Sequence, residues 1–373
     1  MMDAPEKIPV PSDRLASLDF LRGLAMFLLI AEATGLYAIL AAPSLEGTII
    51  EAIDTQFQHH QWNGLHLWDL GQPFFMFISG VAMAFSYGKR WENGAKWGAT
   101  FLHELKRSFL LFFFGWAIYF INPVEGAPAG VFLYDILPQL SFACLIAFLM
   151  MRKSPPFQII FAFGLLILTE LLYRLWAVPG FNQPFVPGQN FGSYIDMLLI
   201  GKLSDGHWVA FSAVPLAALT ICGVMAGQFL RAQRRALSKI KILLAAGFIG
   251  IAAGYSLSFI TPIIRHISTS SFVIISGGLC LLALALSYWL IDVLKVRPGV
   301  KLFAIVGMNP LFIYLFAQTG GKEWFRHIVQ PFCLGLFGWA GERPAQLITS
   351  LAVLALLWSL CYWLYKKKIF IRV

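Results

Sequence analysis

Residues 271–292 read SFVIISGGLCLLALALSYWLID, an apolar run that meets no charged side chain before Asp292. At 1.5 Å per residue, a helix of about 20 such residues spans the hydrocarbon core of a bilayer. Comparable runs recur along the 373-residue chain, in which 58% of the residues are hydrophobic and only 13% are charged. Soluble domains carry about twice that share of charge, and disordered chains lack aromatic residues, so both classes are excluded. A membrane β-barrel would instead show alternating segments of about ten residues.

The apolar runs predict an all-α polytopic membrane protein with about ten transmembrane helices. The predicted spans are 18–42, 68–88, 104–122, 132–151, 157–176, 208–230, 241–260, 271–292, 302–319 and 347–365. They form a single membrane domain over 18–366. A polar segment, 1–17, precedes it without a cleavable signal peptide, and a short tail, 367–373, follows it. Residues 320–346 contain FCLGLFGWAG, which fits a short re-entrant or interfacial helix.

Basic residues distinguish the two sides of the predicted membrane domain. With residue 1 in the cytoplasm, most of the 28 Lys and Arg residues fall on the inner side. The outer side keeps Arg174, Lys202, Arg265, Lys322, Arg326 and Arg343. This bias predicts that both termini are cytoplasmic, and it explains the net charge of +9 by orientation, without nucleic acid as a partner. The five cysteines form no CxxC pair, so we expect neither a disulfide framework nor a metal site.

The first predicted span carries charged residues at both ends. Asp19 and Arg22 are three residues apart near its cytoplasmic start. Two interpretations stay open: a helix-end ion pair, or an Arg22 that binds the phosphates of a cytosolic ligand. Glu32 lies about 15 Å further along the helix, among Leu, Ile and Ala. A carboxylate there must be protonated, paired across helices or facing a wet cavity, which favours a functional role.

Other polar residues extend this pattern across the bilayer. Asp135 and Gln139 lie in the outer half of span 132–151, and Asn309 precedes Pro310, which kinks span 302–319 near mid-membrane. A plain interhelical hydrogen bond is the alternative role for Asn309. Ordered by depth, the polar track contains Arg22, Asn309, Glu32, Asp135, Gln139, His59 and Asp69. Such a track is typical of a transporter, or of an enzyme that takes a donor from the cytosol and acts on an acceptor outside.

The segment QFQHHQWNGLHLWDLGQPFFMFISG, residues 56–80, is the richest in reactive groups. A histidine acts as a general base or an acyl-accepting nucleophile near neutral pH when a partner fixes its tautomer. Trp62 and Asn63 would supply a stacking face and a hydrogen-bonding amide for a sugar.

Two features of this segment have structural alternatives. Asp69 either caps the following helix in a capping box with Gln72, or orients a histidine of the loop. The loop as a whole could be an amphipathic interfacial helix over 45–60 with its tryptophans at the membrane surface. If that helix extends further, His59 and Trp62 lie one turn apart on a shared face.

The first span, RLASLDFLRGLAMFLLI (14–30), followed by HHQWNGLHLWDLGQPFFMFISG (59–80), resembles heparan-α-glucosaminide N-acetyltransferase and its bacterial relatives. The family pattern is Arg-x-x-Ser-x-Asp-x-x-Arg-Gly, then His-x-x-Trp-Asn-Gly, Asp and Pro-x-Phe-x-Phe. It is matched by Arg14, Ser17, Asp19, Arg22, Gly23, His59, Trp62, Asn63, Gly64, Asp69, Pro73, Phe75 and Phe77. Further matches follow in order at 137–139, 194–196, 223–227, 269–273 and 307–310.

The resemblance implies an enzyme of the bacterial inner membrane that moves an acetyl group from cytosolic acetyl-CoA to an amino sugar or glycan fragment outside. A homodimer is compatible with it. It makes His59, three residues before Trp62-Asn63-Gly64, the active-site histidine. It also implies substrate contacts for Trp62, Asn63, Asp135, Gln139 and Asp196, and CoA contacts for Arg22, Asn309 and Ser270.

Two positions depart from the lysosomal enzyme. Glu32-Ala33 stands where that enzyme has an Asn, and Pro138-Gln139-Leu140-Ser141 replaces its Leu-Gln-Arg-Ile, which removes an Arg. We expect Glu32 to bind or deprotonate the amine, while Asp69 orients His59. Direct transfer and a route through acetyl-His59 use the same residues. The alternatives to acyl transfer are an amino-sugar or sugar transporter and, third, a non-catalytic membrane scaffold.

Overall fold

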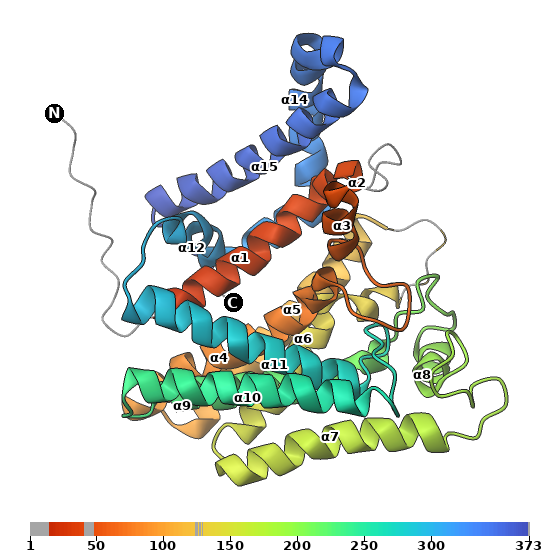
Figure 1. Cartoon of the computed structure of the whole chain (residues 1–373), viewed down its shortest axis with the longest axis vertical. Coiled ribbons are helices and arrows are strands. Elements are labelled where there is room, and N and C mark those ends of the chain that lie inside the picture. The colour runs from red at the N-terminus through yellow and green to blue at the C-terminus, as the bar shows by residue number, and fades with distance from the viewer. Residues whose placement is uncertain (1–14, 41–47, 124–125, 127, 129, 372–373) are drawn as a thin grey trace.

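A computed structural model describes residues 15–40, 48–123, 126, 128 and 130–371, and helices joined by irregular loops make up this part of the chain (Figure 1). The α-helices are α1 (Ala16–Ala33), α2 (Leu36–Leu40), α3 (Ile49–Gln56), α4 (Gly71–Glu92), α5 (Trp97–Ile121), α6 (Ile136–Met150), α7 (Pro155–Leu175), α8 (Phe191–Leu199), α9 (Ala213–Arg231), α10 (Ala236–Leu257), α11 (Ser270–Ser287), α12 (Val300–Met308), α13 (Pro310–Phe316), α14 (Lys322–Phe337) and α15 (Glu342–Lys366). Short 3-10 and π-helical turns extend several of them, including η2 (Leu67–Leu70) before α4. Among the described residues, the only β-type pairing outside these helices is an isolated bridge between Asn63 and Ile264.

Six helices are long and apolar enough to cross a bilayer, which confirms a helical membrane protein. They are Leu67–Glu92, Pro155–Leu175, Ala210–Arg231, Ala236–Leu257, Ser270–Val293 and Glu342–Lys366. Residues Val300–Met308 and Pro310–Ala340 form a further, broken span with a bend of 75°. The other three predicted spans correspond to α1, α5 and α6, but the span predicted over 18–42 is broken after Ala33, and its residues 41–42 lie outside the described part of the chain. Of these, α6 has only 15 residues, and α1 and α5 contain charged side chains within their apolar stretches.

The break in the seventh span lies where the Asn-Pro pair predicts a kink. α12 ends at Met308, and Asn309 has a non-helical backbone before Pro310 begins α13. A second break at Thr319 and Gly320 precedes α14, a helix of 16 residues that packs against α15. Residues 320–346 therefore contain a short separate helix, as expected. α14 and the adjoining end of α15 project from the rest of the molecule, whereas the remainder of α15 packs along α12 and α1 (Figure 1).

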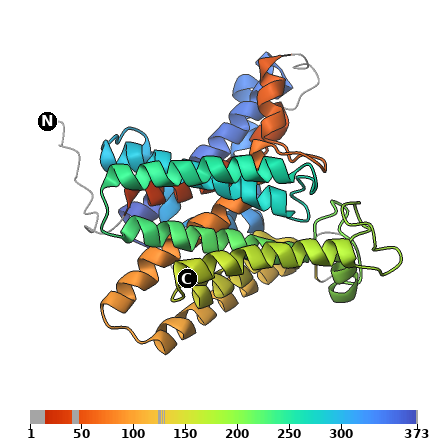
Figure 2. The same ribbon diagram turned by 60° about the horizontal axis from the view of Figure 1, so that its bottom comes forward.

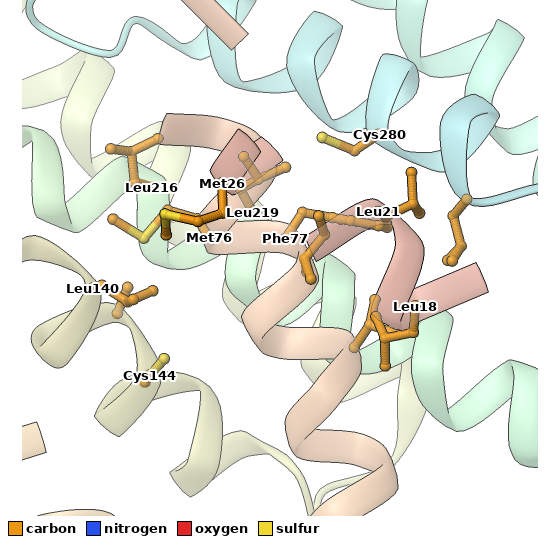
Figure 3. Packing of buried hydrophobic residues seen from close by; sticks show 14 of the residues in the cluster. Leu18, Leu21, Met26, Met76, Phe77, Leu140, Cys144, Leu216, Leu219 and Cys280 are labelled. Carbon is orange, nitrogen blue, oxygen red and sulfur yellow. The ribbon is translucent and has the colours of Figure 1, made fainter. Parts of the chain in front are cut away.

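The hydrophobic core lies where α1, α4, α6, α9 and α11 converge. Figure 3 shows Leu21 and Met26 of α1, Phe77 of α4, Leu140 of α6 and Leu219 of α9 in this cluster. Cys280 of α11 and Cys144 of α6 lie in the same cluster and are free thiols. α10 packs against α11, and α7 packs against α9 at the edge of the bundle (Figure 2).

Two helix pairs approach so closely that their glycines contact backbone. In the α4–α9 pair, a Cβ on Gly223 would lie 2.1 Å from the carbonyl oxygen of Phe77. In the α1–α12 pair, a Cβ on Gly23 would lie 1.9 Å from the carbonyl oxygen of Phe303. Small residues allow this approach, which is how membrane helices gain packing energy where burial from water contributes little. These seams fix the position of α1, which carries Glu32, and of α4, which begins just after Asp69.

The α4–α9 seam predicts a stability difference between two glycines. Gly223→Ala introduces a methyl group against backbone that cannot yield, so we expect a loss of roughly 2 kcal/mol or more and a lower melting temperature in detergent. Gly164→Ala on α7 is the control, because no atom lies within 4 Å of its Cβ position. That variant should match the wild type or gain up to about 1 kcal/mol from helix propensity. Equal melting temperatures for both variants would contradict the close packing of α4 and α9 at Gly223.

Candidate active site at the histidine loop and a basic cavity

The candidate active site forms where three loops meet: 57–66 before α4, 200–212 before α9, and 258–269 before α11. The first and third loops are joined by backbone and side-chain hydrogen bonds. The Gly64 N–H donates to the Ile263 carbonyl (2.9 Å), and the Ile263 N–H donates to Asn63 Oδ1 (3.0 Å). Asn63 therefore joins two loops that are about 200 residues apart in the chain.

The Asp69 carboxylate has no exposed surface and organises the histidine loop. Its Oδ1 lies 2.9 Å from Nδ1 of His59, which is partly exposed. Its Oδ2 accepts the backbone N–H groups of His66 (2.9 Å) and His60 (3.3 Å). The prediction that Asp69 contacts a loop histidine is confirmed. The capping box with Gln72 is wrong, because η2 begins before Asp69 and the carboxylate turns back to cap His66 instead.

The expected shared helix face of His59 and Trp62 is wrong. α3 ends at Gln56, and the chain from Phe57 to His66 is irregular. The interfacial helix considered for 45–60 is in fact the eight residues of α3, and residues 41–47 lie outside the described part of the chain. A continuous helix would have left the buried Asp69 carboxylate without the His60 N–H that the irregular backbone supplies.

The side chains of Trp62 and His59 meet a row of rings from the other two loops. Trp62 stacks on His266 at 5.3 Å, His266 stacks on Trp208 at 3.9 Å, and Trp208 meets His59 edge-on at 5.4 Å. The Trp62 indole N–H donates to the Phe185 carbonyl (2.8 Å). Trp208, and not Trp62, is therefore the ring that contacts His59, and Trp62 stacks on His266.

Arg265 completes the site and was missed from the sequence. Its guanidinium lies 4.1 Å from the centre of the Trp208 ring, and its Nε lies 3.9 Å from Asp69 Oδ1. Burial lowers the pKa of Arg265 to about 10, although Asp69 and Glu32 oppose the shift. Burial, with the nearby Arg265, lowers the pKa of His266 to about 4, so this ring is neutral at pH 7. One signal was available: Arg265 is one of the few basic residues on the outer side.

Glu32 lies at the outer end of α1, next to this site. Its Oε1 accepts the indole N–H of Trp68 at 2.8 Å, and Trp68 directly precedes Asp69. The side chain is otherwise exposed to a cavity of about 450 Å³ that is also lined by Gln318, Lys322, Glu323 and Arg326. The Glu32 carboxylate is therefore paired with a side chain of another element and faces a polar cavity. These are two of the three states expected for a carboxylate at this depth, the third being protonation.

A second cavity, of about 750 Å³, opens toward the predicted cytoplasmic side. Its polar wall consists of Asp19, Arg22, Ser79, Ser86, Tyr87, Lys89, Arg90, His103 and Arg107. Arg22 donates to Asp19 at 2.7 Å while it also lines the cavity, so the two interpretations of Arg22 are compatible. Leu29 and Tyr314 line both cavities, which places the basic cavity and the Glu32 cavity in sequence along α1.

Asp135 and Gln139 connect helices beside the two cavities. Asp135 caps α6 through the Leu137 N–H (2.9 Å) and accepts the hydroxyl of Tyr314 (2.9 Å). Gln139 is buried and accepts the Gln72 amide N–H at 2.5 Å. Neither residue lines a cavity: Asp135 supports Tyr314 from behind the cavity wall, and Gln139 reaches the start of α4 through Gln72.

Asp196 lies on α8, beneath the loop that carries Trp208. It is 1% exposed, and its Oδ1 accepts the Ala210 N–H at 3.0 Å. Burial raises the pKa of Asp196 to about 7, although the Ala210 N–H and the Tyr134 hydroxyl favour the ionised form. Asp196 therefore anchors the segment of Trp208 and touches no atom of His59.

The residues expected to contact CoA do not gather in one place. Asn309 is fully buried, and its amide pairs with the chain near its C-terminal end, donating to the Ile369 carbonyl (3.0 Å) and accepting the Ile371 N–H (2.8 Å). Ile371 itself lines the basic cavity, so Asn309 acts on that cavity through the tail. Ser270 lies at the outer end of α11, where its hydroxyl faces Glu170 at 3.3 Å, remote from Arg22. Among the residues described, no cluster of three His, Cys, Asp or Glu side chains is arranged for a metal ion.

No protein-family model matches this chain, and no curated protein matches it significantly. The function is therefore inferred from the residues and contacts of the two cavities and the histidine loop.

The raised pKa of Asp196 predicts a pH dependence of stability. Because the folded state holds the proton up to about pH 7 while the unfolded carboxyl releases it near pH 4, stability falls as pH rises between these values. From pH 5 to pH 7 the wild type should lose about 2 kcal/mol relative to Asp196→Asn, which cannot ionise. Chemical unfolding at the two pH values measures this difference. Parallel curves for the two proteins would show that Asp196 is not held protonated.

Proposed function

We propose that this protein is a transmembrane acyltransferase that carries an acetyl group from cytosolic acetyl-CoA to the amine of an amino sugar at the outer face. The observation that supports this most is the His59–Asp69 contact at a junction of three outer loops. The proposal includes ten membrane spans with both termini in the cytoplasm, in the inner membrane of a bacterium. It also includes a homodimer as the assembly to be tested.

His59 has the geometry of a general base or an acyl acceptor. With Nδ1–H donated to the buried Asp69 carboxylate, the lone pair on Nε2 is free. In direct transfer, the acceptor nitrogen attacks the thioester carbonyl, Nε2 takes the proton of that nitrogen, and the CoA thiolate leaves. In the two-step route, Nε2 first takes the acetyl group and the thiolate leaves, after which the amine displaces the imidazole. Asp69 supports both routes by stabilising the imidazolium.

The donor side of the proposal is supported by the basic cavity. Arg22, Lys89, Arg90 and Arg107 surround it, and arginine binds phosphate through paired hydrogen bonds. Leu29 and Tyr314 at its far end also line the Glu32 cavity, so an acetyl thioester entering from the inner side would point toward the outer site. An acyl chain needs far less space to pass between the cavities than a whole sugar would.

Glu32 supports the acceptor side. An amine must lose a proton before it attacks a thioester, and a carboxylate at the edge of a cavity next to the His59 loop can bind the ammonium group and accept that proton. The same pair of cavities is the observation that favours the second candidate function, transport of an amino sugar. Vesicle uptake of labelled glucosamine without any acyl donor would support transport, whereas release of CoA only when glucosamine is present would support transfer.

The first test of this proposal compares the two adjacent histidines. His59→Ala should lower acetyl transfer from labelled acetyl-CoA to glucosamine by about 100-fold or more, because the base or nucleophile is gone. His60→Ala is the matched control: its backbone N–H, which contacts Asp69, is retained. It should keep most of the activity. If His59→Ala folds normally and transfers at the wild-type rate, His59 is not the active-site residue.

The second test concerns Glu32. Glu32→Gln keeps the side-chain volume and the acceptor for Trp68 but cannot take a proton, so it should bind acetyl-CoA normally and transfer at least about tenfold more slowly. Its pH–rate profile should lose one limb. Glu323→Gln, which alters another carboxylate of the same cavity, should retain both limbs. A full wild-type rate and profile in Glu32→Gln would leave Glu32 as a packing residue.

A further inference from the structure

A fully buried carboxylate lies behind the wall of the basic cavity. Glu104 of α5 has no exposed surface and does not line the cavity. It accepts the hydroxyl of Tyr87 at 2.5 Å and Nη1 of Arg107 at 3.3 Å. A buried charge without partners would cost several kcal/mol, so Glu104 depends on both contacts. Tyr87 and Arg107, in turn, both line the cavity.

The contact with Tyr87 continues to a second arginine. Tyr87 has one hydroxyl proton, which it donates to Glu104, so it can only accept from Nδ1–H of His103 at 3.2 Å. Nε2 of His103 then carries no proton and accepts from Nη2 of Arg90 at 3.1 Å. The direction of each bond is thereby fixed from Arg90 through His103 and Tyr87 to Glu104.

One carboxylate thus fixes two guanidinium groups. Arg107 is held directly and Arg90 through two intervening side chains, and both line the same cavity. These bonds use Nη1 of Arg107 and Nη2 of Arg90, and each guanidinium keeps further N–H groups. Asp19, the acidic residue in the described lining of this cavity, is already paired with Arg22. A cavity with this balance of charge suits an anion.

We propose that Glu104 is a positioning residue that presets Arg90 and Arg107 as a clamp for the phosphate groups of the ligand in the basic cavity. The inference rests on the proposed function only for the identity of that ligand, a phosphate-bearing acyl thioester. The clamp itself requires a di- or polyphosphate anion. Because the guanidinium groups are already ordered before the ligand binds, little side-chain entropy is lost on binding.

The test measures binding of CoA and of inorganic pyrophosphate to the purified full-length protein by calorimetry. Glu104→Gln preserves the volume and the acceptor for Tyr87, but its amide repels Arg107. Tyr87→Phe removes one hydroxyl and disconnects only the Arg90 branch. Each variant should bind both probes roughly 10-fold more weakly, with a shallower dependence on salt. Glu92→Gln is the control, because Glu92 pairs with Arg231 (2.7 Å) outside the cavity wall, and it should bind like the wild type.

The possible outcomes distinguish failure of the proposed phosphate clamp from failure of the proposed acetyl transfer. The clamp would be overturned if Tyr87→Phe and a folded Glu104→Gln both bind the probes with wild-type affinity and salt dependence. If Glu104→Gln does not fold, the result for Tyr87→Phe decides alone. Equal weakening in Glu92→Gln would also overturn it, because the effect would then not depend on the bonds that Glu104 makes to Tyr87 and Arg107. If pyrophosphate binds through Glu104 and Tyr87 but acetyl-CoA gives no transfer, the clamp stands and the proposed function fails.

Discussion

The half of this protein that carries the histidine loop depends on the burial of a single carboxylate, Asp69. Removing a carboxylate from water is costly unless every lone pair finds a donor, and the chain meets that demand with His59, two backbone N–H groups and the charge of Arg265. These donors come from two loops that join the membrane helices. The same requirement therefore joins the two loops at this end of the bundle and fixes the orientation of the His59 ring.

Local sequence reasoning located this centre but not its surroundings. Asp69 and His59 are ten residues apart in one segment, so their contact could be predicted as one of two roles for Asp69. Trp208 and Arg265 reach the site from loops far along the chain, and no local pattern encodes such a meeting. Asn309 shows the same limit: the kink at Pro310 followed from covalent chemistry, but the amide pairs with a segment 60 residues away.

The two sides of the molecule use charge in opposite ways. At the histidine loop, Arg265 is stacked on Trp208 and compensates the charge of the buried Asp69. At the basic cavity, the buried residue is Glu104, and the arginines line the cavity. In each arrangement, one buried carboxylate, Asp69 or Glu104, fixes the positions of the cationic side chains around it. This explains why charged residues persist in helices whose composition otherwise suits lipid.

The glycine seams between α1 and α12, and between α4 and α9, have a consequence for motion. Helices that touch backbone to backbone cannot slide or rotate without separating, because there are no side chains at the contact to repack. The walls of both cavities are built on these helices. In the proposed transfer, passage between the cavities would then rely on rotation of Tyr314, a buried side chain whose hydroxyl is bonded to Asp135, and not on the rocking of two halves. A gate of this kind would admit a small group while the helices around it stay in place.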